Sequence, residues 1–169
     1  IRHFYFLSTF QVILFKTWLT VVLVFIGIFI TLLSLFRYSN FMKKQLYRTG
    51  PYADFFSQGV LVDKLLTLSG QIGTEEDGSA PSSMEEQMKN CYKNIKDVLS
   101  EYGATMDNII DEVWFVTDVD DCMQNVNDIF KAREEIYGCK PEVTQTLVGV
   151  TALVDPALKI EIKCTAYLD

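Results

Sequence analysis

Histidine is almost absent from this sequence, since its one histidine, His3, lies at the N-terminal end. Residues 42–169 therefore contain no Ser-His-Asp triad, no Cys-His pair and no histidine ligand for a metal. No glycine-rich phosphate loop of a known nucleotide-binding type occurs. The chemistry that remains is that of carboxylates, hydroxyls, amides and the backbone, and we expect neither a cofactor nor a metal.

Closely spaced cysteines are also missing. The four cysteines stand apart without a C-x-x-C pair: Cys91, Cys122, Cys139 and Cys164. This spacing argues against a zinc ribbon or a redox pair and predicts buried thiols.

Acidic residues are missing from residues 1–41, where the full charges are Arg2, Lys16 and Arg37. Residues 18–36 carry no charge, and as a helix they would span about 28 Å, close to the apolar thickness of a bilayer. Basic residues follow this run, and such an excess marks the cytoplasmic side of a membrane. The pattern predicts a transmembrane helix that anchors a cytoplasmic domain.

A second interpretation starts translation at Met42, which opens the segment MKKQLYRTG. The protein would then be a soluble cytoplasmic domain of 128 residues. Both interpretations divide the chain into an apolar leader, 1–41, and a globular domain, 42–169, and both stay open at this point.

Residues 42–169 hold all 22 acidic residues of the chain and 12 basic ones. Proteins that bind nucleic acid by its phosphates need clusters of lysine and arginine. The acidic excess therefore argues against a nucleic-acid partner.

Hydrophobic periodicity predicts strands and helices after a basic linker at 37–48. Strands are expected at 55–62 and 64–72, with Asp63 as the turn of a hairpin, and at 113–116, 143–150 and 158–168. A helix of about five turns is expected to begin with a capping box at Ser82 or Ser83 and to end near Gly103. A second helix is expected between the caps at 118–121 and Gly138.

This order, β-β-α-β-α-β-β, predicts an α+β domain with a mixed sheet and both helices packed on one face. Helical crossovers imply parallel strand pairs, and hairpins at both ends imply antiparallel pairs. Two helices cannot cover the second face of the sheet, so we expect an oligomer.

Three polar positions have both a structural and a functional interpretation. The carboxylates of 118–121 are helix caps or a cation site, and the match to cap positions favours caps. Glu161 alternates away from the core face, as a solvated carboxylate or as a base for a water molecule in a cleft between subunits. Ser69, in LLTLSGQIG, is a strand-end hydroxyl or the rim of a small-molecule site.

Several segments follow one another in an order that resembles the Rid (YjgF-type) family, the reactive intermediate deaminases. They are FFSQGV, LLTLSGQIG, NIKDVLSEYGATMDNIIDEVWFVTDVDD, VNDIF, the turn at Pro141 and KIEIKCTA. The resemblance covers residues 50–168. It implies a fold of the Rid or chorismate-mutase type, a homotrimer, and intersubunit pockets that hydrolyse small 2-imino acids.

Individual positions match the family's pocket residues to different degrees. Ser69 matches the family's pocket serine, with Gly70 beside it, and Glu161 matches the glutamate that positions the attacking water. The pocket tyrosine falls on Phe56, which keeps the ring and loses the hydroxyl.

The family's substrate-binding arginine has no counterpart. Different alignments put Val143, Gln145 or Thr146 at its position, and we favour Gln145 because its amide can reach a carboxylate. Loss of the charge-assisted contact would cost about 1.5–3 kcal/mol, unless its role has moved to another residue such as Lys140 or Lys159. Two functions therefore stay open, an imine or enamine deaminase and a non-catalytic trimer that binds a small metabolite.

Overall fold

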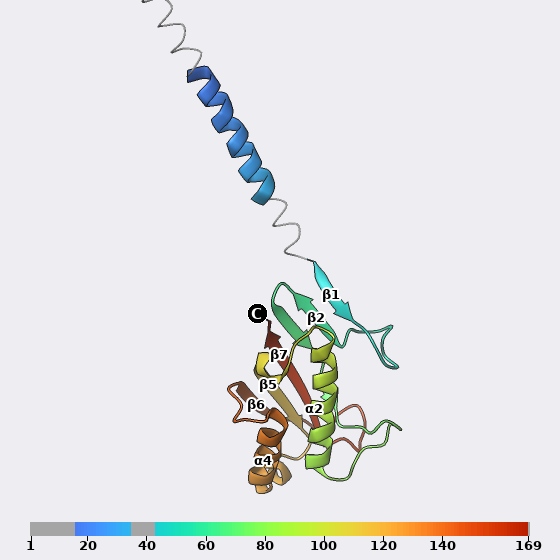
Figure 1. The fold of residues 1–169 in the computed structure, drawn as a ribbon. Coiled ribbons are helices and arrows are strands. Elements are labelled where there is room, and N and C mark those ends of the chain that lie inside the picture. The colour runs from blue at the N-terminus through green and yellow to red at the C-terminus, as the bar shows by residue number, and fades with distance from the viewer. Residues whose placement is uncertain (1–15, 35–42, 169) are drawn as a thin grey trace, which may run out of the picture. The chain divides into compact units, whose positions relative to one another are not determined.

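The computed structural model describes residues 16–34 and 43–168 (Figure 1). The described residues form an N-terminal helix and a separate globular unit that begins at Lys44. The predicted boundary between 41 and 42, and the alternative start at Met42, lie outside the described residues.

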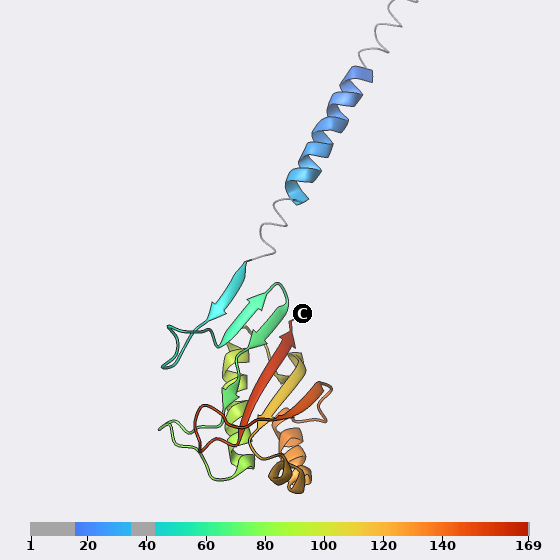
Figure 2. The ribbon, with the colours of Figure 1, turned by 180° about the vertical axis from the view of Figure 1, so that it is seen from behind.

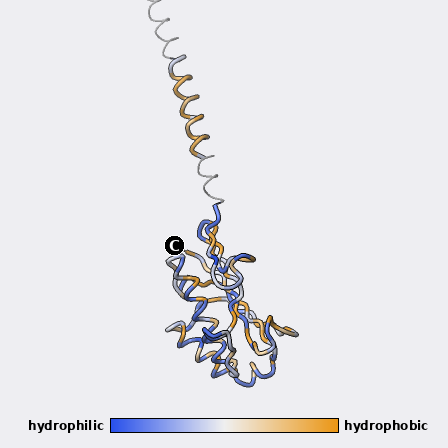
Figure 3. Tube along the Cα trace, turned by 90° about the vertical axis from the view of Figure 1, so that its right-hand side faces the viewer, coloured by the Kyte–Doolittle hydropathy of each residue, from blue (hydrophilic) through white to orange (hydrophobic). Residues whose placement is uncertain are grey.

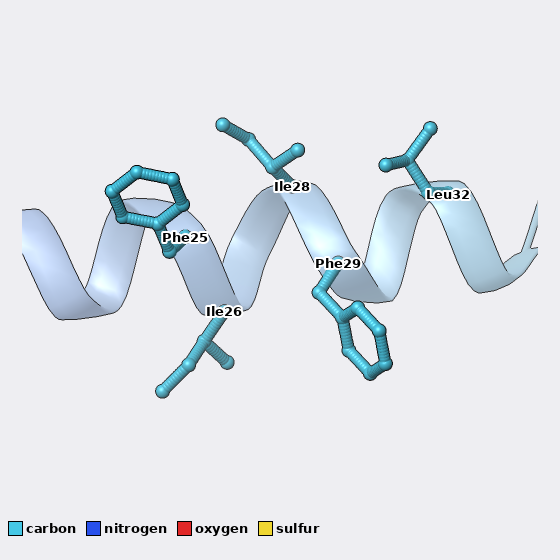
Figure 4. Close-up of a pocket in the computed structure, with 5 residues that line it drawn as sticks. All are labelled: Phe25, Ile26, Ile28, Phe29 and Leu32. Carbon is cyan, nitrogen blue, oxygen red and sulfur yellow. The ribbon is translucent and has the colours of Figure 1, made fainter.

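The N-terminal helix, Lys16–Ser34, has 19 residues and a mean hydropathy of 2.4. Figure 3 shows it as a continuous apolar segment. Apolar side chains project from opposite sides of the helix, Phe25, Ile28 and Leu32 from one and Ile26 and Phe29 from the other (Figure 4). The helix is long and apolar enough to cross a membrane, a criterion that an N-terminal signal sequence also meets. The hollow between these side chains has no polar lining residue and offers no chemistry.

One mixed sheet of seven strands forms the centre of the globular unit within residues 43–168. In chain order the strands are β1 (Lys44–Tyr47), β2 (Gly59–Val62), β3 (Leu65–Leu68), β4 (Gln71–Ile72), β5 (Ile109–Val116), β6 (Thr144–Gly149) and β7 (Ile160–Tyr167). Their spatial order is β1-β2-β3-β7-β5-β6, and β4 pairs with β7 beyond the end of β3. The predicted α+β class with a mixed sheet is confirmed.

The predicted hairpin at Asp63 is confirmed. β2 and β3 pair antiparallel with Val62 opposite Leu65, so Asp63 and Lys64 form the turn between them. Asp63 has a φ of 56°, in the left-handed region that two-residue hairpin turns require.

The C-terminal hairpin is a wrong prediction. β6 and β7 are not neighbours, because β5 lies between them, parallel to β6 and antiparallel to β7. The chain from β6 to β7 therefore crosses over β5, and β7 enters the middle of the sheet, where it pairs with β3 on its other edge.

The helices pack on one face of the sheet, as predicted, and the other face is open in Figure 2. They are α2 (Met84–Ser100), α3 (Val119–Gln124) and α4 (Val126–Tyr137), with a short 3-10 helix, η1 (Met106–Asn108), before β5. The predicted second helix is thus two helices that meet at Asn125. Ser83 does precede α2, but its side chain makes no capping hydrogen bond. Gly138 ends α4 with a φ of 75°, as expected of a left-handed cap.

The predicted linker 37–48 contains a strand that the sequence did not indicate. β1 adds to the edge of the sheet by antiparallel pairing with β2, with Lys44 opposite Val62. Its residues are mostly exposed and show no alternation of apolar and polar side chains. Backbone pairing with a neighbour therefore forms this strand, and the linker pattern carries no sign of it.

A buried glutamine holds the start of β7 against α2. Gln87 donates from Nε2 to the carbonyl oxygens of Pro81, at 2.6 Å, and Ala157, at 2.9 Å. Its Oε1 accepts the backbone N–H of Lys159 at 2.7 Å. Both the nitrogen and the oxygen of this buried amide are thus hydrogen-bonded, and two of the three partners are residues just before β7.

A buried carboxylate joins both long helices to the sheet. Glu112 of β5 accepts two hydrogen bonds at Oε2 from Arg133 of α4, from Nε at 3.0 Å and Nη2 at 2.8 Å. Its Oε1 accepts the hydroxyl of Tyr92 of α2, at 3.0 Å, and that of Tyr137 of α4. Four donated hydrogen bonds compensate the cost of burying this charge.

Removing the guanidinium should leave the Glu112 charge buried without a counter-ion. We expect Arg133→Met to lower the free energy of unfolding by about 3–5 kcal/mol, measured by urea denaturation. Adding Glu112→Gln should recover part of that loss, whereas Lys131→Met, at an exposed position of the same helix, should cost little. A loss under about 1 kcal/mol in Arg133→Met would show that this cluster does not hold the helices.

Candidate functional site

Alternation along β7 divides its side chains between the two faces of the sheet. The side chains packed beneath the helices are buried: Ile160, Ile162, Cys164 and Ala166. Glu161 lies on the open face, as predicted, and pairs with Phe115 of β5 and Ile72 of β4. The open face therefore carries a carboxylate in the middle of the sheet, flanked by strands on both sides.

The Glu161 carboxylate is half-buried, and partial loss of solvent raises its pKa above the usual value for glutamate. Within residues 16–34 and 43–168 no hydrogen bond or ion pair reaches it. Glu112, in contrast, has its charge fully compensated. A desolvated, unpaired carboxylate is available to accept a proton from a ligand or a water molecule.

A bulge opens beside Glu161 between β3 and β4. β3 pairs with β7 as far as Thr67 opposite Thr165, and β4 resumes with Gln71 opposite Ile162. Three residues, 68–70, thus face two residues, 163–164, which is the arrangement of a β-bulge. The predicted strand 64–72 is interrupted at the Ser-Gly sequence that raised the possibility of a site.

Ser69 and Gly70 shape this bulge in different ways. The Ser69 hydroxyl donates to the carbonyl oxygen of Ser57 at 2.8 Å, so its oxygen can still accept a hydrogen bond. Gly70 lies against the carboxylate, and a Cβ built on it would be 1.8 Å from Oε1 of Glu161. Only glycine leaves room for the observed position of the Glu161 side chain.

A hollow of about 590 Å³ lies over these residues on the open face. It is lined by Lys44, Ser57, Val60, Val62, Leu65, Thr67, Leu68, Ser69, Gly70, Phe115, Glu161 and Lys163. Three predicted site residues, Ser69, Gly70 and Glu161, therefore come together. The hollow combines an apolar floor with a few polar groups, which is the usual composition of a small-molecule site.

Gln145 does not line this hollow in the single chain, and its role in a site stays a prediction. It pairs in register with Glu112, so both side chains lie on the face that the helices cover. Leu147, two residues further along β6, packs against the core on the same side. The Gln145 amide nitrogen is buried and has no hydrogen-bond partner among the described residues.

The two other predicted residues lie outside the hollow. Thr146 pairs with Val113 and so shares the open face, but it does not line the hollow. Phe56 precedes β2 and stacks on Tyr52, with ring centroids 5.9 Å apart.

Two lysines of the hollow were missed as site residues. Lys163 follows Glu161 by two positions on β7, and Lys44 comes from the unpredicted strand β1. The signal for Lys163 was present, because the alternation that exposes Glu161 exposes Lys163 on the same face. Lys44 could not be placed without knowing that β1 pairs with β2.

The predictions for the carboxylates of 118–121 and for the four cysteines can be compared with the local geometry. Asp118 accepts the backbone N–H of Asp121 at 2.9 Å, which confirms the capping interpretation. Among residues 16–34 and 43–168, no three histidine, cysteine or acidic side chains converge as a metal site. Three cysteines are buried as predicted and Cys139 is exposed, contrary to prediction.

Comparison with known proteins finds one family model and several similar proteins. The family model described as Endoribonuclease L-PSP matches residues 42–168. The RutC family protein YjgH of Escherichia coli K12 is 33% identical over 113 residues, which cover 67% of this chain and 82% of that protein. A 2-iminobutanoate/2-iminopropanoate deaminase of Rattus norvegicus is 32% identical over 78 residues, 45% of this chain and 56% of that protein.

A solved structure shares the fold. The crystal structure of YyfA, a protein of the Rid family from Yersinia pestis, superimposes with a TM-score of 0.62 at 27% identity. The match covers 75% of this chain and all of that chain.

The contact between Gly70 and Glu161 can be tested without a ligand. Gly70→Ala should push the Glu161 side chain toward solvent, and its pKa should then fall toward the usual glutamate value. NMR titration of the Glu161 carboxyl measures this shift. Ser69→Ala adds no atom and should leave the titration as in the wild type; an unchanged pKa in Gly70→Ala would mean that the glycine is not required by Glu161.

Proposed function

The chain belongs to the Endoribonuclease L-PSP family, the YjgF or Rid proteins, and from this we propose that it hydrolyses a small imine. One observation carries the proposal: the Glu161 carboxylate is half-buried and unpaired among the described residues, in a hollow that it shares with Ser69 and Gly70. The name of the rat relative, an iminobutanoate and iminopropanoate deaminase, supports the same chemistry.

In the proposed reaction Glu161 accepts a proton from a water molecule as the water oxygen attacks the imine carbon. The proton passes to the imine nitrogen, so that the carbon bears a hydroxyl and an amino group. The hydroxyl proton then moves to nitrogen, the C–N bond breaks, and ammonia leaves a carbonyl product. Burial makes Glu161 a stronger base for the first step. Ser69 can accept a hydrogen bond from the imine N–H, since its own hydroxyl donates to Ser57.

The proposal places this hollow between subunits of a homotrimer. The open face of the sheet presents apolar side chains such as Leu65, which is 47% exposed, and Val60 and Phe115, which are half-buried. Burying this face against other copies would remove apolar surface from water and enclose the hollow. Ultracentrifugation of the full chain in detergent should give a protein mass of three times 19.3 kDa.

For the N-terminal helix we propose a membrane anchor through residues 18–36. Its composition supports the proposal, and the basic residues that follow it support a cytoplasmic side for the globular unit. The full chain should then stay with membranes after alkaline carbonate extraction, whereas a chain that begins at Met42 should be released.

A non-catalytic role in metabolite binding is the second candidate. It is favoured by the lining of the hollow, which includes no arginine among the described residues. Ligand-dependent thermal stabilisation without turnover would support this role. Cleavage of RNA, the activity in the family's description, is disfavoured by the excess of acidic residues in 42–169.

The deaminase proposal predicts that Glu161→Gln releases ammonia from freshly generated 2-iminobutanoate at least about 100-fold more slowly than the wild type. Glutamine preserves the size of the side chain and cannot accept the proton. Glu142→Gln, which neutralises an exposed carboxylate before β6, should keep full activity.

The pH profile of kcat/KM provides a second test of the role of Glu161. Because the deprotonated form acts, kcat/KM should rise with pH through the raised pKa of Glu161, above the usual range for glutamate. Equal rates for wild type and Glu161→Gln, after subtraction of spontaneous hydrolysis, would refute the enzymatic proposal.

A further inference from the structure

The hollow beside Glu161 is locally basic in a strongly acidic unit. Its charged lining residues are Lys44, Lys163 and Glu161, whereas residues 42–169 as a whole have 22 acidic and 12 basic residues. Two cations around one carboxylate favour a ligand that carries negative charge.

Lys163 is the cation closest to Glu161 along the strand. The two residues are separated by one position on β7, so their side chains share the open face with Cα atoms about 7 Å apart. No ion pair within residues 16–34 and 43–168 engages Lys163, with Glu161 or with any other residue. Two opposite charges on neighbouring sites thus remain unpaired, with the bulge at 68–70 directly alongside.

The other lysines are less well placed to bind a ligand beside Glu161. Lys44 lines the hollow from β1, three strands from β7 in the sheet order. The Nζ of Lys159 is 4.0 Å from Oδ2 of Asp121, and this residue borders a different hollow between α2 and α4. Lys140 belongs to the turn between α4 and β6 and does not line the hollow.

We propose that Lys163 is the residue that binds the carboxylate of a 2-imino acid, or of its 2-oxo product, in this hollow, and that it determines the preference for these ligands over uncharged analogues. In such ligands the carboxylate is bonded directly to the carbonyl or imine carbon. A carboxylate bound by Lys163 can therefore bring the reactive carbon close to Glu161, since both side chains line the same hollow. The inference rests on the proposed function for the reaction, while the binding selectivity is measurable without turnover.

The test compares binding of 2-oxobutanoate with binding of its uncharged amide, 2-oxobutanamide, to the full chain by titration calorimetry. Wild type should bind the carboxylate at least about tenfold more tightly than the amide. Lys163→Met should abolish this preference, and Lys163→Arg should retain it. Lys64→Met is the matched control, because Lys64 is an exposed lysine that lies over the Tyr167 ring, outside the hollow. This substitution should leave the preference for the carboxylate over the amide unchanged.

Each outcome separates the two proposals. If Lys163→Met keeps the preference, or if wild type shows none, the role of Lys163 is overturned, even where imine turnover is observed. If the preference depends on Lys163 and no imine is hydrolysed, the inference stands and the proposed reaction fails. Equal melting temperatures of the lysine variants would confirm that the comparison reports binding and not folding.

Discussion

Pairing of β7 on both edges is the constraint on which the site depends. β3 and β4 border it on one side and β5 on the other, so its backbone is held in register along its length. Its side chains must then alternate strictly between the core and the open face. Glu161 and Lys163 lie together on the open face because Ile160, Ile162 and Cys164 are buried together on the other. A slip of one residue would bury both charges and expose the apolar row.

Two glutamates on neighbouring strands illustrate how environment divides similar side chains between structure and function. Glu112 lies under the helices, where Arg133 and two tyrosines compensate its charge and tie the helices to the sheet. Glu161 lies on the opposite face, partly desolvated and without such partners among the described residues. The compensated carboxylate contributes to stability, and the uncompensated one keeps the acceptor capacity that the proposed reaction requires.

The residues that line the hollow include no arginine, and this limits how the hollow could recognise an anion. Gln145, the residue favoured for that role from the sequence, faces the helices beside Glu112. The open face offers Lys163 in its place, two residues from the proposed base. A lysine provides charge without the planar, bidentate geometry of a guanidinium, so we infer recognition by charge with looser control of orientation. The apolar remainder of the hollow and its closure by further copies would then do more to orient the ligand.

Local patterns in the chain were enough to predict the class of the fold, the Asp63 hairpin, the amphipathic helix α2, the cap at Asp118 and the exposure of Glu161. These features depend on residues a few positions apart, where periodicity and capping act. Other features came only from the folded chain: the central position of β7, the edge strand β1, the bulge at 68–70, the helix-facing side of Gln145 and the presence of Lys44 and Lys163 in one hollow. Each of them is set by pairing between segments distant in sequence, where the total burial of apolar surface and the backbone hydrogen bonds of the whole sheet select one strand order and one register.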